Sequence, residues 1–229
     1  MSNSVLVLFD IDGTLIQSGR AGVRGMNLAF DRLYGRPQAL NGVPVAGRTD
    51  RAIVTQAMGA IGVDPTADAI AGLRDAYFEN LKVELHRVVA EPSGILPGVT
   101  SLIDRLEARR DVVVGLLTGN FQGGAVIKLG HFDLWHRFRL GSFGDEHHDR
   151  RALVPVALER AREAGLDISR PEQVVIIGDT PLDVDCAKAN GSRSLAVATG
   201  LYDRATLDAT GADLVLQTLE DVAAIDEWI

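Results

Sequence analysis

The chain of 229 residues is 46% apolar, which is enough to bury a full hydrophobic core and argues against intrinsic disorder. Its 31 acidic residues outnumber the 23 basic ones and give a formal net charge of −8, which argues against nucleic acid or an anionic membrane as a partner. The apolar run before Asp10 is too short for a signal peptide or a membrane span. Together with a single cysteine, Cys186, which cannot form an internal disulfide, this predicts a cytoplasmic protein.

Short apolar runs alternate with stretches of helical periodicity along most of the chain. The runs are apolar on nearly every residue, as in strands covered on both faces, and they span residues 5–9, 112–117, 174–177, 194–198 and 213–216. Helical periodicity is clearest over residues 99–109, 153–164, 183–189 and 219–227. This alternation predicts an α/β fold with a doubly wound parallel sheet.

One region, residues 18–92, interrupts the alternation. It shows helical patterns over residues 25–34, 50–61 and 67–86 and no convincing strand. An insert directly after the first strand would lie above the carboxyl ends of the sheet, where open α/β sheets bind ligands. We therefore expect two domains, an α/β core of residues 1–17 plus 93–229 and a helical cap of residues 18–92, with joints near residues 16–19 and 91–96.

Two carboxylates follow the first predicted strand. Strand alternation places Asp10 and Asp12 on the same side of the chain at the carboxyl edge of the sheet. Carboxylates so close repel one another unless a cation lies between them, and Mg²⁺ is a hard ion that prefers oxygen ligands. One carboxylate can then attack phosphorus, while the other gives a proton to the leaving alkoxide and later activates water.

The second predicted strand ends in Thr118, Gly119 and Asn120. A hydroxyl followed by a glycine at the head of a helix is a plausible phosphate seat, because the helix N-terminus offers free N–H donors and a favourable dipole. Alone, the same residues are also typical of a turn that caps a helix.

A third strand end carries Asp179, and Asp183 follows in the opening turn of the next helix. Asp179 can complete a magnesium site with Asp10 and Asp12, and Asp183 can hold water or orient the ligands. Simple capping of the helix by acidic residues is the alternative. Three strand ends with groups suited to phosphate or metal favour the site.

Taken together, these residues resemble the haloacid dehalogenase-like hydrolase superfamily, and within it the phosphoglycolate-phosphatase-like group with a helical (C1-type) cap. The resemblance covers nearly the whole chain. It rests on the string DIDGTL at residues 10–15, on Thr118 and on the string GDTPLD at residues 178–183.

The resemblance implies a role for each matching residue. The first aspartate of the family is the nucleophile and the second is the general acid/base, which implies these roles for Asp10 and Asp12; the backbone carbonyl of Asp12 would also bind the metal. Thr118 would bind the phosphoryl group. Asp179 would be a Mg²⁺ ligand, supported by Asp183.

The sequence departs from the family pattern where a lysine is expected before the helix that precedes the last motif. Residues 147–153 contain no lysine. Arginine can also neutralise phosphate and the nucleophile, with bidentate geometry, so we expect Arg150 to take this role, with Arg151 as the alternative. Gly119 stands where relatives often carry asparagine, and there the backbone amide would do the binding.

Several weaker candidates complete the set. Arg20, Arg24 and Arg48 of the cap can reach a substrate carboxylate and so set specificity, or can be solvated surface residues. The pair His147 and His148 lies among acidic residues in a polar loop, where a transition-metal site is the less favoured interpretation. We expect Cys186 to have a packing role.

These observations predict a Mg²⁺-dependent phosphatase that hydrolyses a small-molecule phosphate monoester, with phosphoglycolate as the first substrate to consider. A phosphosugar mutase on the same framework and, from another class, a phospho-aspartate signalling or binding module are the alternatives. A dehalogenase is disfavoured because Asp12 would have no alkoxide to protonate. A phosphonate-cleaving enzyme would need a reactive cap lysine, and the only lysine there is Lys82. The sequence does not determine the oligomeric state.

Overall fold

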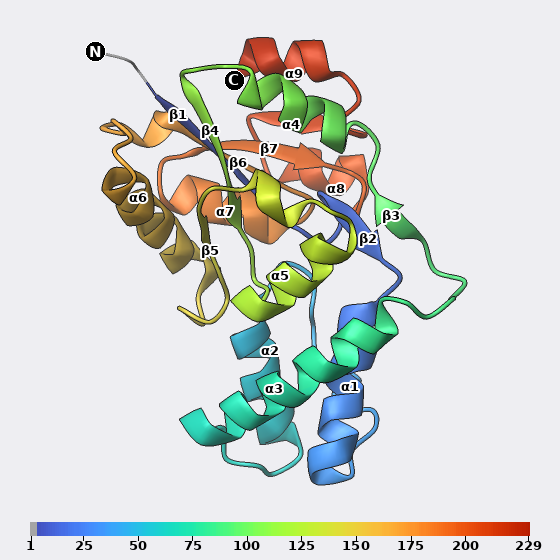
Figure 1. Cartoon of the computed structure of the whole chain (residues 1–229). Helices are drawn as coiled ribbons and strands as arrows, with labels where there is room; N and C mark the ends of the chain where they lie inside the picture. The colour runs from blue at the N-terminus through green and yellow to red at the C-terminus, as the bar shows by residue number, and fades with distance from the viewer. Residues whose placement is uncertain (1–3) are drawn as a thin grey trace.

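The computed structural model of the protein describes residues 4–229 and is built around a six-stranded parallel sheet (Figure 1). The strand order is β5-β4-β1-β6-β7-β8, so β1 lies between β4 and β6. The strands are β1 (Val5–Phe9), β4 (Val112–Leu117), β5 (Gly141–Ser142), β6 (Val174–Gly178), β7 (Arg193–Val197) and β8 (Leu214–Leu216). The predicted α/β class is therefore confirmed. The two-residue edge strand β5 is too short to leave a pattern in the sequence.

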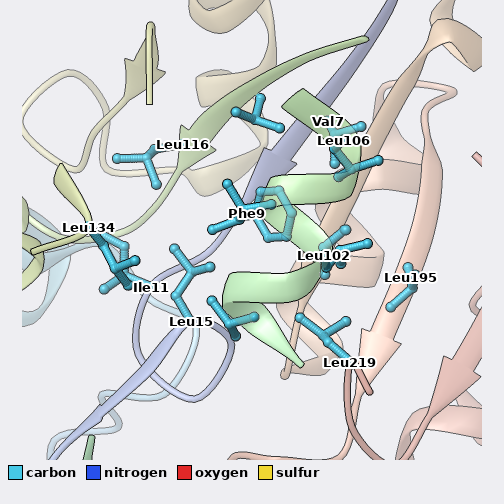
Figure 2. Close-up of a cluster of buried hydrophobic side chains, with 14 of the residues drawn as sticks. Val7, Phe9, Ile11, Leu15, Leu102, Leu106, Leu116, Leu134, Leu195 and Leu219 are labelled. Atoms are coloured by element: carbon cyan, nitrogen blue, oxygen red, sulfur yellow. The ribbon is translucent and has the colours of Figure 1, made fainter. Parts of the chain in front are cut away.

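Helices cover both faces of this sheet. They are α4 (Val99–Glu107), α5 (Gln122–His131), α6 (Leu153–Glu163), α7 (Pro181–Ala189), α8 (Arg204–Ala209) and α9 (Val222–Trp228), and short 3-10 turns lie at Trp135–Arg137, Arg150–Ala152 and Pro171–Gln173. Successive side chains of β1 enter opposite layers, as strand geometry requires. Val7 and Phe9 pack with Leu102 of α4 (Figure 2), whereas Leu6 packs on the other face with Val154 of α6. Because both faces are buried, the central strands β1, β4 and β6 carry only apolar residues and glycine.

Three further helices form a separate layer with a hydrophobic core of its own. These are α1 (Ala21–Tyr34), α2 (Asp50–Ala60) and α3 (Ala67–Glu84), and we refer to residues 19–92 as the helical segment. Phe30 of α1, Met58 of α2 and Tyr77 of α3 are fully buried in this second core. Among residues 4–229, no helix combines the length and the apolar character that a bilayer-spanning helix requires.

Two short strands connect the helical segment to the parallel sheet. β2 (Ile16–Ser18) and β3 (Ser93–Ile95) pair antiparallel, with Ile16 opposite Ile95. The N–H of Gly19 continues the ladder by donating to the carbonyl oxygen of Pro92 over 2.9 Å. The two stretches in which the domain joints are expected, residues 16–19 and 91–96, are thus hydrogen-bonded to each other. The sequence pattern did not predict these two strands, because the segments IQS and SGI contain no apolar run.

Candidate active site

A cavity of about 510 Å³ lies between the carboxyl edge of the sheet and the helical segment. Its floor includes Asp10 and Asp12, which follow β1, Asn120, which follows β4, and Asp179, which follows β6. The helical segment supplies the other wall, which is largely apolar and includes Met26, Leu40 and Ile53. The sequence-predicted strand ends therefore do meet at one place, as parallel strand ends must.

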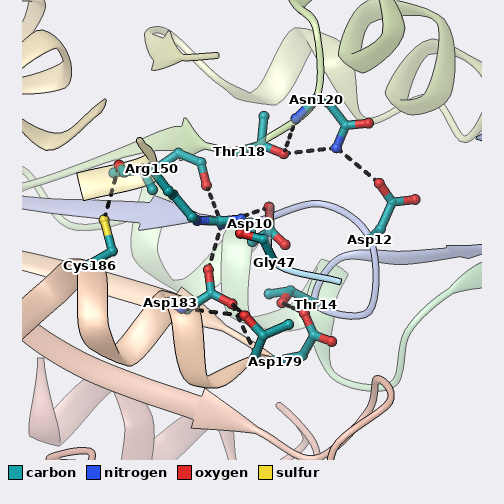
Figure 3. Close-up of polar contacts among 12 residues, drawn as sticks. Asp10, Asp12, Thr14, Gly47, Thr118, Asn120, Arg150, Asp179, Asp183 and Cys186 are labelled. Carbon is teal, nitrogen blue, oxygen red and sulfur yellow. Dashed lines mark hydrogen bonds and ion pairs between the residues drawn. The ribbon is translucent and has the colours of Figure 1, made fainter. Parts of the chain in front are cut away.

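Three buried carboxylates form a group at this edge of the sheet, and two of them, Asp10 and Asp179, line the cavity. Oxygen atoms of Asp10, Asp179 and Asp183 all lie within 4.8 Å of one another (Figure 3). Burial, and then repulsion from Asp183 and Asp12, raise the pKa of Asp10 to about 6, although Arg150 opposes this. Burial and the charges of Asp183 and Asp10 likewise raise the pKa of Asp179 well above its ordinary value. Crowded oxygen donors of this kind suit a hard divalent cation.

The backbone around Asp179 closes tightly on its carboxylate. A Cβ atom on Gly13, where φ is +83°, would lie 2.4 Å from Asp179 Oδ2, and one on Gly200 would lie 1.7 Å from the same oxygen. Only glycine fits at either position, because real Cβ atoms do not approach so closely. The carboxylate of Asp179 is thus fixed in a narrow cradle, and the group of three carboxylates is placed to hold a divalent metal ion.

Asp12 has different partners. Its Oδ2 lies 2.5 Å from Nζ of Lys128 and accepts a hydrogen bond from Asn120 Nδ2 over 2.9 Å, while Oδ1 accepts from Ser18 Oγ over 3.3 Å. Burial opposes the charged form, but the Lys128 ammonium and these hydrogen bonds outweigh it and hold the pKa of Asp12 below its ordinary value. Lys128 is thus the positive charge that contacts the Asp12 carboxylate in this structure, and a cation shared by Asp10 and Asp12 stays a prediction. Lys128 is not among the site residues predicted from the sequence.

The predicted phosphate seat is ordered by hydrogen bonds among its own residues. Thr118 is fully buried, and its Oγ1 accepts from the backbone N–H of Asn120 over 3.3 Å and from Asn120 Nδ2 over 2.8 Å. Gly119 and Asn120 line the cavity directly, whereas Thr118 lies beneath them. The turn leads into α5, so its backbone N–H groups stand at a helix N-terminus.

Of the two candidate arginines, Arg150 reaches the carboxylates. It is 6% exposed, and its Nη2 lies 3.0 Å from Asp10 Oδ1 and 2.5 Å from Asp183 Oδ1. Arg151 turns to the surface and pairs with Asp185 at 2.6 Å. The geometry thus favours Arg150 over Arg151 as the substitute for the missing lysine.

Asp183 caps a helix with one carboxylate oxygen and lies in the carboxylate group with the other. Its Oδ2 accepts hydrogen bonds from the N–H of Thr180 over 3.0 Å and from Thr180 Oγ1 over 2.7 Å, and its own N–H donates to Thr180 Oγ1 over 3.3 Å. This reciprocal capping box begins α7. The other oxygen, Oδ1, contacts Arg150 and belongs to the carboxylate group.

One loop of the helical segment is docked on the core beside the phosphate seat. The N–H of Asp50 donates to the carbonyl oxygen of Gly119 over 2.6 Å, and Asp50 Oδ2 accepts from the N–H of Phe121 over 2.8 Å. Thr49 caps α2 and donates through Oγ1 to the carbonyl oxygen of His148 over 3.0 Å. Burial raises the pKa of Asp50 to about 7, although Lys128 opposes this. Asp50 is the first residue of the helix predicted over residues 50–61, and it is not among the site residues predicted from the sequence.

Comparison with known proteins places this geometry in a family. The sequence profile of the haloacid dehalogenase-like hydrolases matches residues 7–197. The chain belongs to this family. A phosphoglycolate phosphatase of Pseudomonas putida is 30% identical over 226 residues, which cover 93% of this chain and 76% of the relative. The resemblance found in the sequence, to a hydrolase of this family like the phosphoglycolate phosphatases, is thereby confirmed.

Solved structures share the fold of this chain. A predicted phosphoglycolate phosphatase from Haemophilus somnus matches with a TM-score of 0.70 and 20% identity, covering 98% of this chain and 99% of that one. A putative β-phosphoglucomutase from Thermotoga maritima matches with a TM-score of 0.64 and 22% identity, with the same coverage. At this identity the likeness concerns the fold alone.

The three cap arginines of this hydrolase differ in position. Arg20 and Arg48 line the cavity, but Nη1 of Arg48 already donates to Gln56 Oε1 over 2.6 Å. Arg24 does not line the cavity; it forms an ion pair with Glu84 at 2.5 Å, inside the helical segment. A specificity role is therefore better supported for Arg20 and Arg48 than for Arg24.

The remaining candidates lie outside the cavity. His147 and His148 are exposed, and among residues 4–229 neither belongs to a group of side chains placed to hold a metal. Cys186 is fully buried on α7, where burial raises the pKa of its thiol to about 12. Its Sγ donates to the carbonyl oxygen of Arg150 over 3.4 Å, consistent with the expected packing role.

Proposed function

We propose that the protein is a Mg²⁺-dependent phosphatase that hydrolyses a small-molecule phosphate monoester through an aspartyl-phosphate on Asp10. The observation that carries this proposal is the position of the Asp10 carboxylate. It lies at the carboxyl edge of the sheet, contacts the Arg150 guanidinium, belongs to a group of three buried carboxylates and lines the cavity. A nucleophile, a fixed positive charge and metal-type ligands thus lie at one point.

The first half-reaction transfers the phosphoryl group to the enzyme. An oxygen of Asp10 forms a bond to phosphorus as the bond to the ester oxygen breaks, and the electron pair stays with the leaving oxygen. That oxygen takes a proton from Asp12, whose affinity for a proton increases when a phosphate dianion binds beside it. Arg150 offsets the charge on the transferring group, and the amides after Thr118 hold its oxygens.

The second half-reaction releases phosphate. Water attacks phosphorus and gives its proton to the Asp12 carboxylate, and the bond between phosphorus and Asp10 breaks with the electron pair returning to Asp10. The Asp10, Asp179 and Asp183 carboxylates, with the carbonyl oxygen of Asp12, would hold the Mg²⁺ ion. When bound, this ion supplies positive charge that stabilises the phosphoryl group in transfer.

Residues 18–92 act in this proposal as a cap domain on a core of residues 1–17 and 93–229. The contacts of Asp50 and Thr49 with the core hold this domain against the site, where limiting the access of water would favour the first half-reaction. Phosphoglycolate is the first substrate to test, because the curated relatives bear the name of that activity.

The test is an assay of phosphate release from an aryl phosphate and from a panel with phosphoglycolate and sugar phosphates. It compares the wild type with Asp10→Asn, each with Mg²⁺ and with a chelator. Metal-dependent release that Asp10→Asn abolishes supports the proposal. Absence of release by the folded wild type in Mg²⁺ refutes it, and an isomerised sugar phosphate in place of free phosphate would establish a mutase.

A further inference from the structure

A buried lysine of the core contacts the proposed acid/base, although no sequence motif marks it. Lys128 lies in the last turn of α5, is 5% exposed and lines the cavity. Its Nζ lies 2.5 Å from Asp12 Oδ2 and donates to Asn120 Oδ1 over 2.7 Å. The other two lysines of the chain, Lys82 and Lys188, are exposed and lie outside the cavity lining.

The position of Lys128 is costly for the fold. Burying an ammonium group is unfavourable unless charged or polar partners replace water, and methionine would fill the same space without that cost. The partners of Lys128 are Asp12 and Asn120, and both line the cavity. The lysine therefore serves the cavity rather than a hydrophobic contact of α5.

Lys128 also fixes the orientation of the Asp12 carboxylate. Two donors, Lys128 Nζ and Asn120 Nδ2, converge on Oδ2, and Ser18 Oγ donates to Oδ1. Because Lys128 also holds Oδ1 of Asn120, the amide group of Asn120 is oriented with its Nδ2 toward Asp12 and Thr118. These donors bind the carboxylate form of Asp12, which is the form that accepts a proton from water.

We propose that Lys128 is a positioning residue for the second half-reaction, in which it holds the Asp12 carboxylate as the base that activates water. The inference rests on the proposed function. In this step the oxygen of water bonds to phosphorus, its proton passes to Asp12, and the bond from phosphorus to Asp10 breaks with its electron pair returning to Asp10. Lys128 itself transfers no proton in this step. The consequence of this positioning is that Asp10 loses its phosphoryl group rapidly. A phosphatase needs this rapid loss, whereas a signalling module does not.

The test is pre-steady-state hydrolysis of an aryl phosphate in Mg²⁺, because an aryl leaving group departs without a proton and isolates the second step. Lys128→Met should lower kcat by about 10²-fold, the lower end of the effect of a general base, and leave kcat/KM within about threefold. KM should fall in parallel with kcat. Lys128→Met should release a burst of aryl alcohol of close to one equivalent per active site. Its intact mass should also show a phosphoryl adduct. Lys82→Met is the matched control and should show neither.

A purely structural role of Lys128 predicts a different result. Equal losses in kcat and kcat/KM without a burst or adduct, or an unchanged kcat, would overturn the inference while leaving the phosphatase intact. If thermal unfolding shows that Lys128→Met does not fold, Lys128→Gln is measured in the same way; Lys128→Arg, which retains the charge, should recover most of kcat. A wild type that releases no aryl alcohol overturns both this inference and the proposed function.

Discussion

The guanidinium of Arg150 bridges Asp10 and Asp183, with its Nη2 3.0 Å from an oxygen of the first and 2.5 Å from an oxygen of the second. The same guanidinium also donates to the carbonyl oxygens of Leu117 and Gly47, over 3.1 and 3.2 Å. One side chain thus joins the proposed nucleophile, the end of β4 and a loop of the helical segment. Its contacts suggest that Arg150 orders the site as well as neutralising it.

Replacing Arg150 by methionine should therefore reduce both activity and stability. We expect kcat/KM to fall by about 10²-fold or more because a fixed charge beside the phosphoryl group is lost. Removing one partner of a buried ion pair typically lowers the free energy of unfolding by about 3–5 kcal/mol. Steady-state kinetics and chemical denaturation in Mg²⁺ measure the two effects. Arg151→Met, at the exposed neighbour, is the control and should change kcat/KM and the free energy of unfolding only slightly. A larger loss of activity in Arg151→Met than in Arg150→Met would show that Arg151 takes the place of the expected lysine.

Mg²⁺ should stabilise the folded protein, and the effect should depend on Asp179. At a Mg²⁺ concentration of a hundred times Kd, a single site raises the free energy of unfolding by about 2.7 kcal/mol. Asp179→Asn should lose this increase. In the presence of a chelator the variant should be more stable than the wild type, because burial and neighbouring carboxylates disfavour a charge at this position. Differential scanning calorimetry tests this, with Asp185→Asn at the half-exposed carboxylate of α7 as the control.

Asp50 should make stability depend on pH. Burial raises its pKa in the folded protein from an ordinary 3.8 to about 7, so the unfolded chain ionises first as pH rises. The stability that protonated Asp50 contributes is fully present below about pH 4. It is lost as the pH rises through 7, which lowers the free energy of unfolding by up to about 4 kcal/mol. Asp50→Asn removes this dependence, so its Tm minus that of the wild type should increase between pH 4 and pH 8. A constant difference would show that Asp50 does not titrate in this way.

The docking of the helical segment can be tested at Gly119. A Cβ atom there would lie 2.1 Å from the carbonyl oxygen of Arg48, so Gly119→Ala should push the docked loop away from the core. We expect kcat/KM to fall by about tenfold or more, because small displacements at a reaction centre are costly. Gly72→Ala, at an exposed helical position with open space around it, is the control; it should retain activity and add about 0.5–1 kcal/mol of stability. Full activity of Gly119→Ala would contradict a tight contact.

The sequence predicts the carboxylate group because parallel strands bring their carboxyl ends to one edge. Asp10 and Asp179 each follow a run that is apolar throughout, so local pattern alone determines where they meet. The choice between Arg150 and Arg151 is different. Adjacent residues of a 3-10 turn point in different directions, and only the packing of that turn against α7 decides which side chain is buried.

Lys128 was missed for a related reason. Lys128 lies eight residues after Asn120, and this spacing does not predict that the two side chains contact each other. A signal was nevertheless present, since Lys128 shares the buried face of α5 with Gly124 and Ala125. A charged residue at helical spacing from small buried residues indicates a buried partner of opposite charge. The sequence does not identify that partner as Asp12, because Asp12 follows a different strand.

The antiparallel pair of β2 and β3 has a consequence for how the protein can vary. Because Ser18 and Ser93 are paired neighbours, residues 19–92 leave the sheet and return to it at adjacent points. Only a short turn would be needed to rejoin the two strands, and a different module could be grafted between them without altering the register of the main sheet. The ribbon is therefore a point at which the helical segment could be replaced while the residues at the carboxyl edge of the sheet stay in place.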